Sequence, residues 1–277
     1  MRYVFVSDIH GCYDKLISTL NQAQFNRDAD TIVSVGDPFD RGPQSREVLE
    51  FLMSCPNRIL IWGNHDLRLR QLILGGEFPQ KYDKSNGVME TLQSFCGENY
   101  RVSDMSIGVQ ILKSNDDCRD VYKLLWQYFD ECVYAAEWSD LVATHAWVPV
   151  LIHDKKTVID VWGFPSTRYI YKYYDDWRNA DADWWDDATW CNSQAMFSQK
   201  IFVPGKTLLI GHWHSWRFCE MERRIPYTDE EIIDCSTYTF EDKFIAIDGC
   251  SNYDKGGRVN AYVYESDDAP QFIRPLK

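Results

Sequence analysis

One stretch near the start of the chain decides the fold: residues 3–11 have the sequence YVFVSDIHG. Its apolar first half has the β-branched and aromatic composition of a buried strand, and its second half supplies Asp8 and His10. Four later stretches repeat the arrangement of a short apolar run followed by Asp, Asn or His. The five clusters are Asp8-Ile9-His10-Gly11, Gly36-Asp37-Pro38-Phe39-Asp40-Arg41-Gly42, Gly63-Asn64-His65-Asp66, Thr144-His145-Ala146 and Gly211-His212-Trp213-His214. Each cluster is predicted to stand at the carboxyl end of a strand.

The segments between the first three clusters indicate an α/β fold. Apolar residues recur at helical spacing after Tyr13 and again after Pro43, which predicts strand, helix and strand in alternation. A parallel, right-handed βαβαβ unit is the simplest arrangement. Further apolar runs in the last third predict a second, partly antiparallel sheet. In open α/β sheets a ligand binds outside the carboxyl ends of the strands, so the five clusters are expected to meet.

We expect one domain over residues 1–277, because the clusters run from residue 8 to residue 214 and a split would separate them. The hydrophobic share of 45% is ample for a core. An insertion is expected at roughly 150–200, where Tyr and Trp alternate with Asp between Trp162 and Trp190. Two interpretations stay open for its aromatic rings: they pack the insertion onto the sheet, or the insertion caps the site and stacks on a substrate ring.

The composition of the chain limits the kinds of partner that it is expected to bind. The formal net charge of −13 argues against binding of duplex nucleic acid, because no basic stripe is present to displace counterions from phosphates. No apolar run reaches membrane-spanning length, and no secretory leader is recognisable. The nine cysteines form no CxxC pair and are expected to be reduced thiols. These features predict a cytoplasmic protein without membrane contact, and they do not indicate its oligomeric state.

The residue types in the clusters are those of a two-metal hydrolase. Divalent metals accept carboxylate and imidazole ligands, and such a site needs one carboxylate that bridges both ions. Asp37 is the expected bridge, and Asp8 with His10 is expected to chelate the first ion. The remaining predicted metal ligands are Asn64, His145, His212 and His214. Mn is expected first, although the same ligands accept Fe, Zn or Ni.

Three further residues are predicted to serve catalysis and substrate binding. Arg41 offers the fork geometry that grips phosphate oxygens, and Asn64 and His65 are expected to face the substrate beside it. His65 is predicted to protonate the leaving oxygen as a general acid, with Asp40 orienting its ring. A metal-activated hydroxide is the expected nucleophile. Phosphorylated proteins or small phosphate esters are therefore the expected substrates.

The motifs at residues 8–11, 36–42 and 63–66 resemble those of the calcineurin-like metallophosphoesterases, within them the phosphoprotein phosphatase branch, with its DxHG, GDxxDRG and GNH[ED] signatures. The resemblance continues at His145 and at residues 211–214. It implies a two-sheet β-sandwich flanked by helices, with a dinuclear metal centre. By position it implies one metal held by Asp8, His10, Asp37 and His214, and the other by Asp37, Asn64, His145 and His212.

The details around the motifs point to two substrate classes. The surroundings of Cys12 and Pro43 are similar to bacterial members that include symmetrical diadenosine tetraphosphate hydrolases. That subgroup usually lacks the acidic residue present here as Asp40, which protein phosphatases keep. Phosphomonoester hydrolysis, with phosphoserine and phosphothreonine proteins as substrates, is therefore the first hypothesis. Dinucleoside polyphosphate or phosphodiester hydrolysis is the alternative, and a binding module that has lost catalysis is a third.

Two departures from the family pattern are visible. Trp147 stands where members often have Gly, and the second histidine of the Gly-His-Trp-His motif is one that protein phosphatases generally lack. The second phosphate-binding arginine of many protein phosphatases has no clear counterpart, with Arg168 and Arg178 as nominal candidates.

Overall fold

The computed structural model describes residues 1–159, 165–223, 235–253 and 256–275. Its first sheet has four strands in the order β11 (Ala261–Glu265), β1 (Arg2–Val6), β2 (Thr31–Ser34) and β3 (Arg58–Leu60). The three early strands are parallel, as predicted, and β11 pairs antiparallel with β1. The expected βαβαβ unit is completed by helices α1 (Tyr13–Gln22) and α2 (Ser45–Ser54).

The second sheet contains the strands that follow the helical middle of the chain. Its six strands lie in the order β12 (Gln271–Ile273), β4 (Ala135–Glu137), β5 (Leu141–Thr144), β8 (Thr207–Ile210), β10 (Phe244–Ala246) and β9 (Tyr238–Phe240). The three central strands β5, β8 and β10 are parallel to one another, and the outer pairings are antiparallel. This is the predicted second, partly antiparallel sheet.

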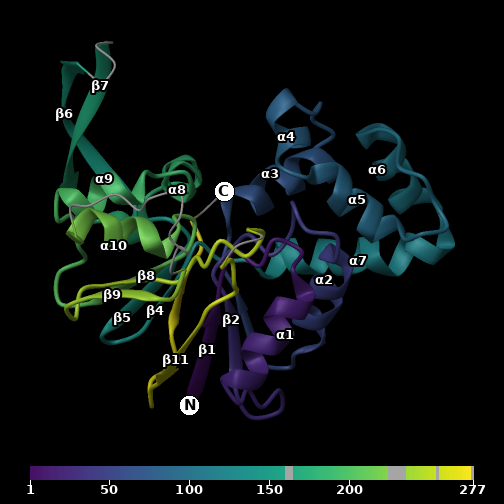
Figure 1. Cartoon of the computed structure of the whole chain (residues 1–277), viewed down its shortest axis with the longest axis horizontal. Helices are drawn as coiled ribbons and strands as arrows, with labels where there is room; N and C mark the ends of the chain where they lie inside the picture. The colour runs from purple at the N-terminus through teal and green to yellow at the C-terminus, as the bar shows by residue number, and fades with distance from the viewer. Residues whose placement is uncertain (160–164, 224–234, 254–255, 276–277) are drawn as a thin grey trace.

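The two sheets pack face to face through one apolar layer (Figure 1). Phe5 and Val33 from the first sheet belong to the same buried cluster as Ala143 and Leu209 from the second. Trp138 closes this layer and contacts the rings of Tyr3 and Phe5 edge to face. Side chains alternate along a strand, so the central strands β1, β2, β5 and β8 contribute to this layer on one side and to a helix-covered layer on the other.

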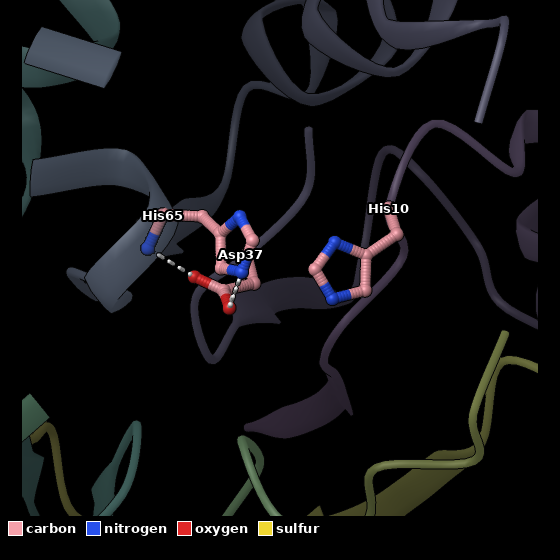
Figure 2. A group of neighbouring side chains, drawn as sticks. All are labelled: His10, Asp37 and His65. Carbon is pink, nitrogen blue, oxygen red and sulfur yellow. Dashed lines mark hydrogen bonds and ion pairs between the residues drawn. The ribbon is translucent and has the colours of Figure 1, made fainter. Parts of the chain in front are cut away.

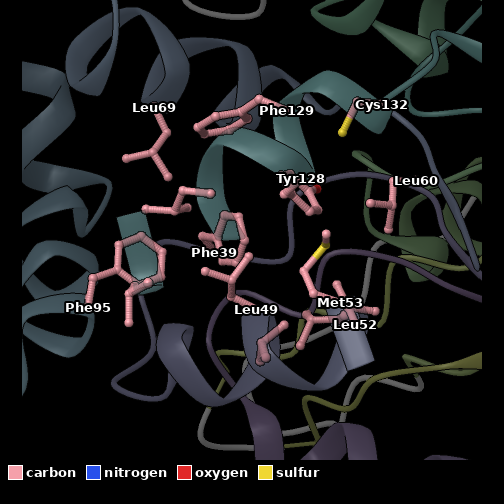
Figure 3. Packing of buried hydrophobic residues seen from close by; sticks show 14 of the residues in the cluster. Phe39, Leu49, Leu52, Met53, Leu60, Leu69, Phe95, Tyr128, Phe129 and Cys132 are labelled. Atoms are coloured by element: carbon pink, nitrogen blue, oxygen red, sulfur yellow. The ribbon is translucent and has the colours of Figure 1, made fainter. Parts of the chain in front are cut away.

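Helices cover the outer face of the first sheet (Figure 1). Besides α1 and α2 they are α3 (Asn64–Ile73), α4 (Lys81–Ser85), α5 (Val88–Cys96), α6 (Met105–Ser114) and α7 (Asp116–Glu131). All of these helices except α4 contribute to an apolar cluster that includes Phe39, Leu49, Phe95 and Tyr128 (Figure 3). Phe39 follows β2 and contacts the rings of Phe95 and Tyr128, so this core fixes the loop that carries the second cluster.

The outer face of the second sheet is covered by the segment expected as an insertion and by a later helix. The covering elements are η1 (Trp177–Asn179), α8 (Ala182–Thr189), α9 (Ser193–Ser198) and α10 (Ser215–Arg223). Trp177 and Trp185 are fully buried in this layer beside Trp147, whereas Trp184 and Trp190 are exposed. The insertion begins with a hairpin of β6 (Val150–Ile159) and β7 (Pro165–Tyr173), which projects from the body (Figure 1). Trp162 lies outside the described residues.

The architecture is the expected α/β fold, a two-sheet sandwich flanked by helices. The nine cysteines are free thiols. Among the described residues, no helix combines the length and apolar character needed to cross a membrane.

Candidate metal centre

The five clusters emerge at the same end of the sandwich, because the strands before them run in parallel within each sheet. Asp8 and His10 follow β1, and Asp37 follows β2. Asn64 and His65 open α3, directly after β3. His145 follows β5, and His212 and His214 follow β8. The packing of the two sheets then brings the clusters of the first 70 residues against those near residues 145 and 212.

Asp37 is the central carboxylate of the site. It belongs to two groups whose possible ligand atoms lie within 4.8 Å of one another, His10–Asp37–His65 and Asp37–His145–His212. Its Oδ2 atom is 3.3 Å from His145 Nε2 and 3.9 Å from His65 Nε2. Figure 2 shows how His10, Asp37 and His65 converge from three strand ends. A carboxylate between two groups of nitrogen donors has the placement that a bridging ligand requires.

Asp8 lies beside the first of these groups. Its Oδ1 atom is 3.9 Å from His10 Nε2, and its Oδ2 atom accepts hydrogen bonds from Ser7 and from the His212 amide. The amide bond is 2.9 Å long and joins residues 204 positions apart in the sequence. Burial is the main cause that raises the pKa of Asp8, and the neighbouring Asp37 raises it further. A cation would offset the cost of keeping these carboxylates charged.

Two imidazoles have a fixed orientation because Nδ1 faces a main-chain carbonyl. His10 Nδ1 is 2.8 Å from the oxygen of Phe39, and His145 Nδ1 is 2.8 Å from that of Val35. With Nδ1–H donating, Nε2 is the atom left to face a metal, as in most histidine ligands. His145 Nε2 is 2.9 Å from Asn64 Oδ1, which places the amide oxygen in the second group.

The electrostatics of the centre reflect several charges in a buried place. Burial alone would lower the pKa of His145, but the carboxylates of Asp37 and Asp8 raise it to about 10. Burial alone would raise the pKa of Asp37, but the imidazoles of His145 and His65 hold it well below its usual range. Burial and the neighbouring His145 lower the pKa of His212 to about 3. These opposed shifts have one cause, the buried negative charge of Asp8 and Asp37, which divalent cations would compensate.

His65 and Asp40, the predicted acid pair, lie in contact. Nδ1 of His65 is 2.7 Å from Oδ2 of Asp40, and both side chains are buried. Nε2 of His65 therefore faces the side of Asp37, where Nη2 of Arg41 is 3.3 Å away. Burial opposes protonation of His65, but the charges of Asp37 and Asp40 outweigh it and raise its pKa. Arg41 and the free nitrogen of His65 thus face the same space.

His214 stands apart from the two groups around Asp37. Its Nε2 atom lies 3.9 Å from Oδ2 of Asp248, and the two residues form a third group with Cys250. Burial raises the pKa of Asp248, and nearby Asp8 raises it further, to about 7. The two nominal candidates for a second phosphate-binding arginine lie outside all three groups. Arg178 bonds the carboxylate of Glu137, and Arg168 is exposed on β7.

Three residues of the site had no predicted role. Asp248 directly follows the apolar run 244–247, and β10 is parallel to β8, so the strand-end rule used for the five clusters would have found it. Thr91 on α5 donates its hydroxyl to Asp40 Oδ1 over 3.0 Å and accepts the Asp40 amide over 2.9 Å. Asp66 accepts the amides of Gly63 and Asp37 and the hydroxyl of Tyr128. No local pattern marks Thr91 as a site residue.

The backbone around the site is strained where side chains must turn inward. Six of the predicted site residues have positive φ values between 47° and 69°: Asp8, His10, Asp37, Asp40, Arg41 and His212. Non-glycine residues rarely adopt this region, and such strain clusters at functional sites. Gly63 is required for space and not for a positive φ value, because a Cβ at this position would overlap the carboxylate of Asp37. The glycine before Asn64 thus allows the third strand end to approach the second.

The residues present suit divalent cations. Carboxylate oxygens, imidazole nitrogens and an amide oxygen surround the central carboxylate, and the two fixed histidines keep Nε2 free. The allocation of ligands predicted from the sequence gives Asp8, His10, Asp37 and His214 to one ion and Asp37, Asn64, His145 and His212 to the other. In the structure Asp37, His145 and His212 form one group, while His214 lies with Asp248.

Comparison with known proteins identifies the family of the chain. Residues 1–243 match the model of the calcineurin-like phosphoesterase family. Over 91 residues the chain is 38% identical to the symmetrical bis(5'-nucleosyl)-tetraphosphatases of Salmonella paratyphi B and Salmonella newport, covering 32% of this chain and 32% of each relative. The matched stretch thus spans about a third of these curated relatives.

Solved structures match over most of the chain. A metallophosphoesterase from Sphaerobacter thermophilus aligns with 18% identity and a TM-score of 0.46, covering 100% of this chain and 90% of that one. A protein serine/threonine phosphatase from Saccharomyces cerevisiae aligns with 11% identity and a TM-score of 0.42, covering 98% and 82%. The family match runs from β1 to residue 243, so the chain belongs to the calcineurin-like phosphoesterase family.

Proposed function

We propose that this chain is a phosphomonoesterase with a dinuclear metal centre, and that phosphoserine and phosphothreonine side chains of proteins are its substrates. The observation that carries the proposal is the 2.7 Å contact between His65 Nδ1 and Asp40 Oδ2. A serine or threonine phosphate must release a poorly stabilised alkoxide, so an oriented proton donor lowers the barrier. A nucleotide leaving from a polyphosphate is already a stable anion and needs that proton far less.

In this proposal the metal ligands are those predicted from the sequence: Asp8, His10, Asp37 and His214 for one ion, and Asp37, Asn64, His145 and His212 for the other. Two such cations lower the pKa of a bound water and screen the phosphoryl oxygens when they are present. The close grouping of His10, His145 and His212 around Asp37 supports these three ligands. Mn is the metal we propose to test first, followed by Fe, Zn and Ni.

The other residues of the chain bind the substrate and move a proton. Arg41 would hold phosphoryl oxygens through its guanidinium, and Asn64 and His65 would contact the same group. With its Nδ1–H directed at Asp40, His65 would carry the transferable proton on Nε2, 3.3 Å from Arg41 Nη2. The leaving oxygen would therefore lie in front of these two side chains, within reach of both. Thr91 and Asp40 keep the imidazole in this orientation through a buried hydrogen-bond chain.

The test is a comparison of hydrolysis rates with purified protein reconstituted with Mn. Phosphoserine and phosphothreonine peptides are compared with diadenosine tetraphosphate, and kcat/KM is measured for each. The proposal expects the peptides to react at least tenfold more efficiently. A preference for diadenosine tetraphosphate would contradict it. Metal content, measured by mass spectrometry on the same samples, shows whether each preparation carries two ions per chain.

A second candidate is hydrolysis of dinucleoside polyphosphates. The observation that favours it is the 38% identity over 91 residues to proteins described as symmetrical bis(5'-nucleosyl)-tetraphosphatases. The exposed rings of Trp184 and Trp190 on the insertion offer aromatic surface of the kind that stacks on nucleobases. If this candidate holds, a Trp184→Ala variant should raise KM for diadenosine tetraphosphate and leave KM for a phosphopeptide unchanged.

A further inference from the structure

Within the described residues, the outer part of the β6–β7 hairpin has little cover from the rest of the chain, whereas Tyr169 and Tyr171 near its base bond Gln199 through their main chains. The hairpin forms a separate two-stranded sheet and projects from the body beside α8 and α9 (Figure 1). With ten residues in β6, the strand spans roughly 33 Å at the usual rise per residue. All of residues 151–157 and 165–169 are exposed. An isolated two-stranded hairpin is marginally stable in water. We therefore expect a projecting arm of this length to be stabilised by contact with another surface.

The exposed side chains of the arm are partly apolar. Ile152 is 62% exposed, Tyr169 is 42% exposed and Leu151 is 40% exposed. Ile152 pairs across the hairpin with Tyr171, whose ring lies 6.2 Å from that of Tyr169. Ile152 and Tyr169 therefore form a small exposed apolar patch, next to the point where Tyr171 packs on the chain's own core, and exposed apolar patches can mark contact surfaces.

The arm is also basic within an acidic protein. Residues 150–173 contain four basic side chains and two acidic ones, a net charge of +2 in a chain whose total is −13. Lys156 and Arg168 stand directly opposite each other in the hairpin register. Like charges in directly opposed positions destabilise a β-ladder unless an anionic surface compensates them. The arm thus favours an acidic partner with apolar contacts.

An acidic surface with exposed aromatic rings follows the arm in the sequence. Residues 174–190 contain six aspartates and one arginine. Asp175, Asp176, Asp181, Asp183 and Asp187 are exposed, and so are the rings of Trp184 and Trp190. This surface, on η1 and α8, lies near the base of the arm, whereas the arm extends away from it (Figure 1). The arm of one molecule therefore does not cover its own acidic surface, but it can reach that of another.

We propose that the β6–β7 hairpin is a dimerisation arm that lies on the acidic, aromatic η1–α8 surface of a second copy of this chain. Because arm and acidic surface are adjacent on one molecule, a two-fold axis next to them lets both copies exchange arms in a closed, isologous contact. A stable interface takes roughly 20–30 residues from each side, a number that the arm and α8 together supply. A nucleic acid is the less suitable occupant, because the acidic remainder of the chain would repel it.

Sedimentation analysis of the full chain at about 10 µM tests this proposal. The unmodified chain should be a dimer at low ionic strength and should shift toward monomer in 0.5 M NaCl, where charge attraction is screened. Lys156→Glu combined with Arg168→Glu should weaken the dimer at least tenfold, and Asp183→Lys combined with Asp187→Lys should do the same. The fourfold variant, with both reversals in one chain, should dimerise again because arm and surface are complementary once more.

Controls separate the contact from general charge effects. Lys84→Glu combined with Lys113→Glu, on exposed positions of α4 and α6 away from the arm, should leave the dimer intact. Circular dichroism melting shows that each variant is folded. A chain that is monomeric at low salt would overturn the proposal, and so would an arm-reversed chain that dimerises like the unmodified one. Failure of the fourfold variant to dimerise would overturn the assignment of η1–α8 as the surface that the arm contacts.

Discussion

Replacement of His65 by Asn tests the core of the proposed chemistry. The variant removes the Nε2 proton donor and the partner of Asp40, but it keeps the main-chain amide of residue 65, which bonds Asp37 Oδ1 over 3.0 Å. The ligands around Asp37 should therefore keep their positions. We expect metal content equal to that of the unmodified chain and a selective loss of rate on substrates that leave as alkoxides.

The expected loss of rate in His65→Asn follows from the oriented contact between His65 and Asp40. An oriented general acid contributes roughly 10²- to 10⁴-fold to a rate, or about 3–5 kcal/mol of transition-state stabilisation. A phosphoserine peptide needs the whole of that contribution. An activated aryl ester such as 4-nitrophenyl phosphate releases a stable phenolate, so its rate should fall less than about tenfold. Asp40 is 2% exposed and loses one partner, which should also lower the free energy of unfolding by about 1–3 kcal/mol.

The assay is kcat/KM for both substrates, measured at saturating Mn with metal content determined in parallel. Asp40→Asn serves as the matched variant, because it keeps the imidazole and weakens its orientation. It should show the same dependence on leaving group with a smaller loss. Equal slowing of the peptide and the aryl ester by His65→Asn would refute the general-acid role. A loss of bound metal in the variant would show that His65 acts on the metal centre instead.

Three further predictions concern residues around the site and the core. Thr91→Val removes the hydroxyl that bonds Asp40 twice, and should lower kcat on phosphopeptides about tenfold with KM unchanged; an unchanged kcat would argue against its positioning role. Gly63→Ala places a methyl group against the central carboxylate, and should weaken metal binding 10- to 100-fold in a competition assay with a chelator. Arg58 lowers the pKa of Glu131 through two hydrogen bonds of 2.7 Å. The pair therefore stabilises the fold fully at pH values above the unfolded pKa of Glu131, near 4.5. This stabilisation is lost as the pH falls through the lower pKa that Glu131 has in the folded chain. Arg58→Met should therefore cost up to about 1 kcal/mol more at pH 7 than at pH 2, by urea unfolding at both values, because its bonds to the carbonyls of Met53 and Cys55 are lost at either pH.

Much of the site could be predicted because its information is local. Asp8 and His10 follow a buried apolar run directly, and the same is true of Asn64 and His65. A short run of apolar residues marks a buried strand, so the end of that strand can be located from the sequence. Asp248 obeys the same rule after β10, and it was missed because a lone Asp after a short run has no second chemical residue beside it.

Other residues could not be placed from the sequence because their contacts are distant in the chain. Thr91 reaches Asp40 across 51 positions, through the packing of α5 against the loop after β2. His214 stays a predicted ligand of the first ion, and its 3.9 Å approach to Asp248 could not be read from the sequence. Residues 150–173 were expected to begin an insertion, but no sequence rule showed that residues 151–157 and 165–169 lie exposed on a projecting hairpin.

The sequence by itself determined which residue types stand at the ends of which strands, and so the class of chemistry. Patterns with a period of two residues and motifs of three to seven residues can be recognised in the sequence without a structure. Only the tertiary structure decided which of these side chains face one another, such as Asp8 and the amide of His212. The reason is physical: that contact depends on two sheets packing through a shared apolar layer, and packing is a property of the whole chain.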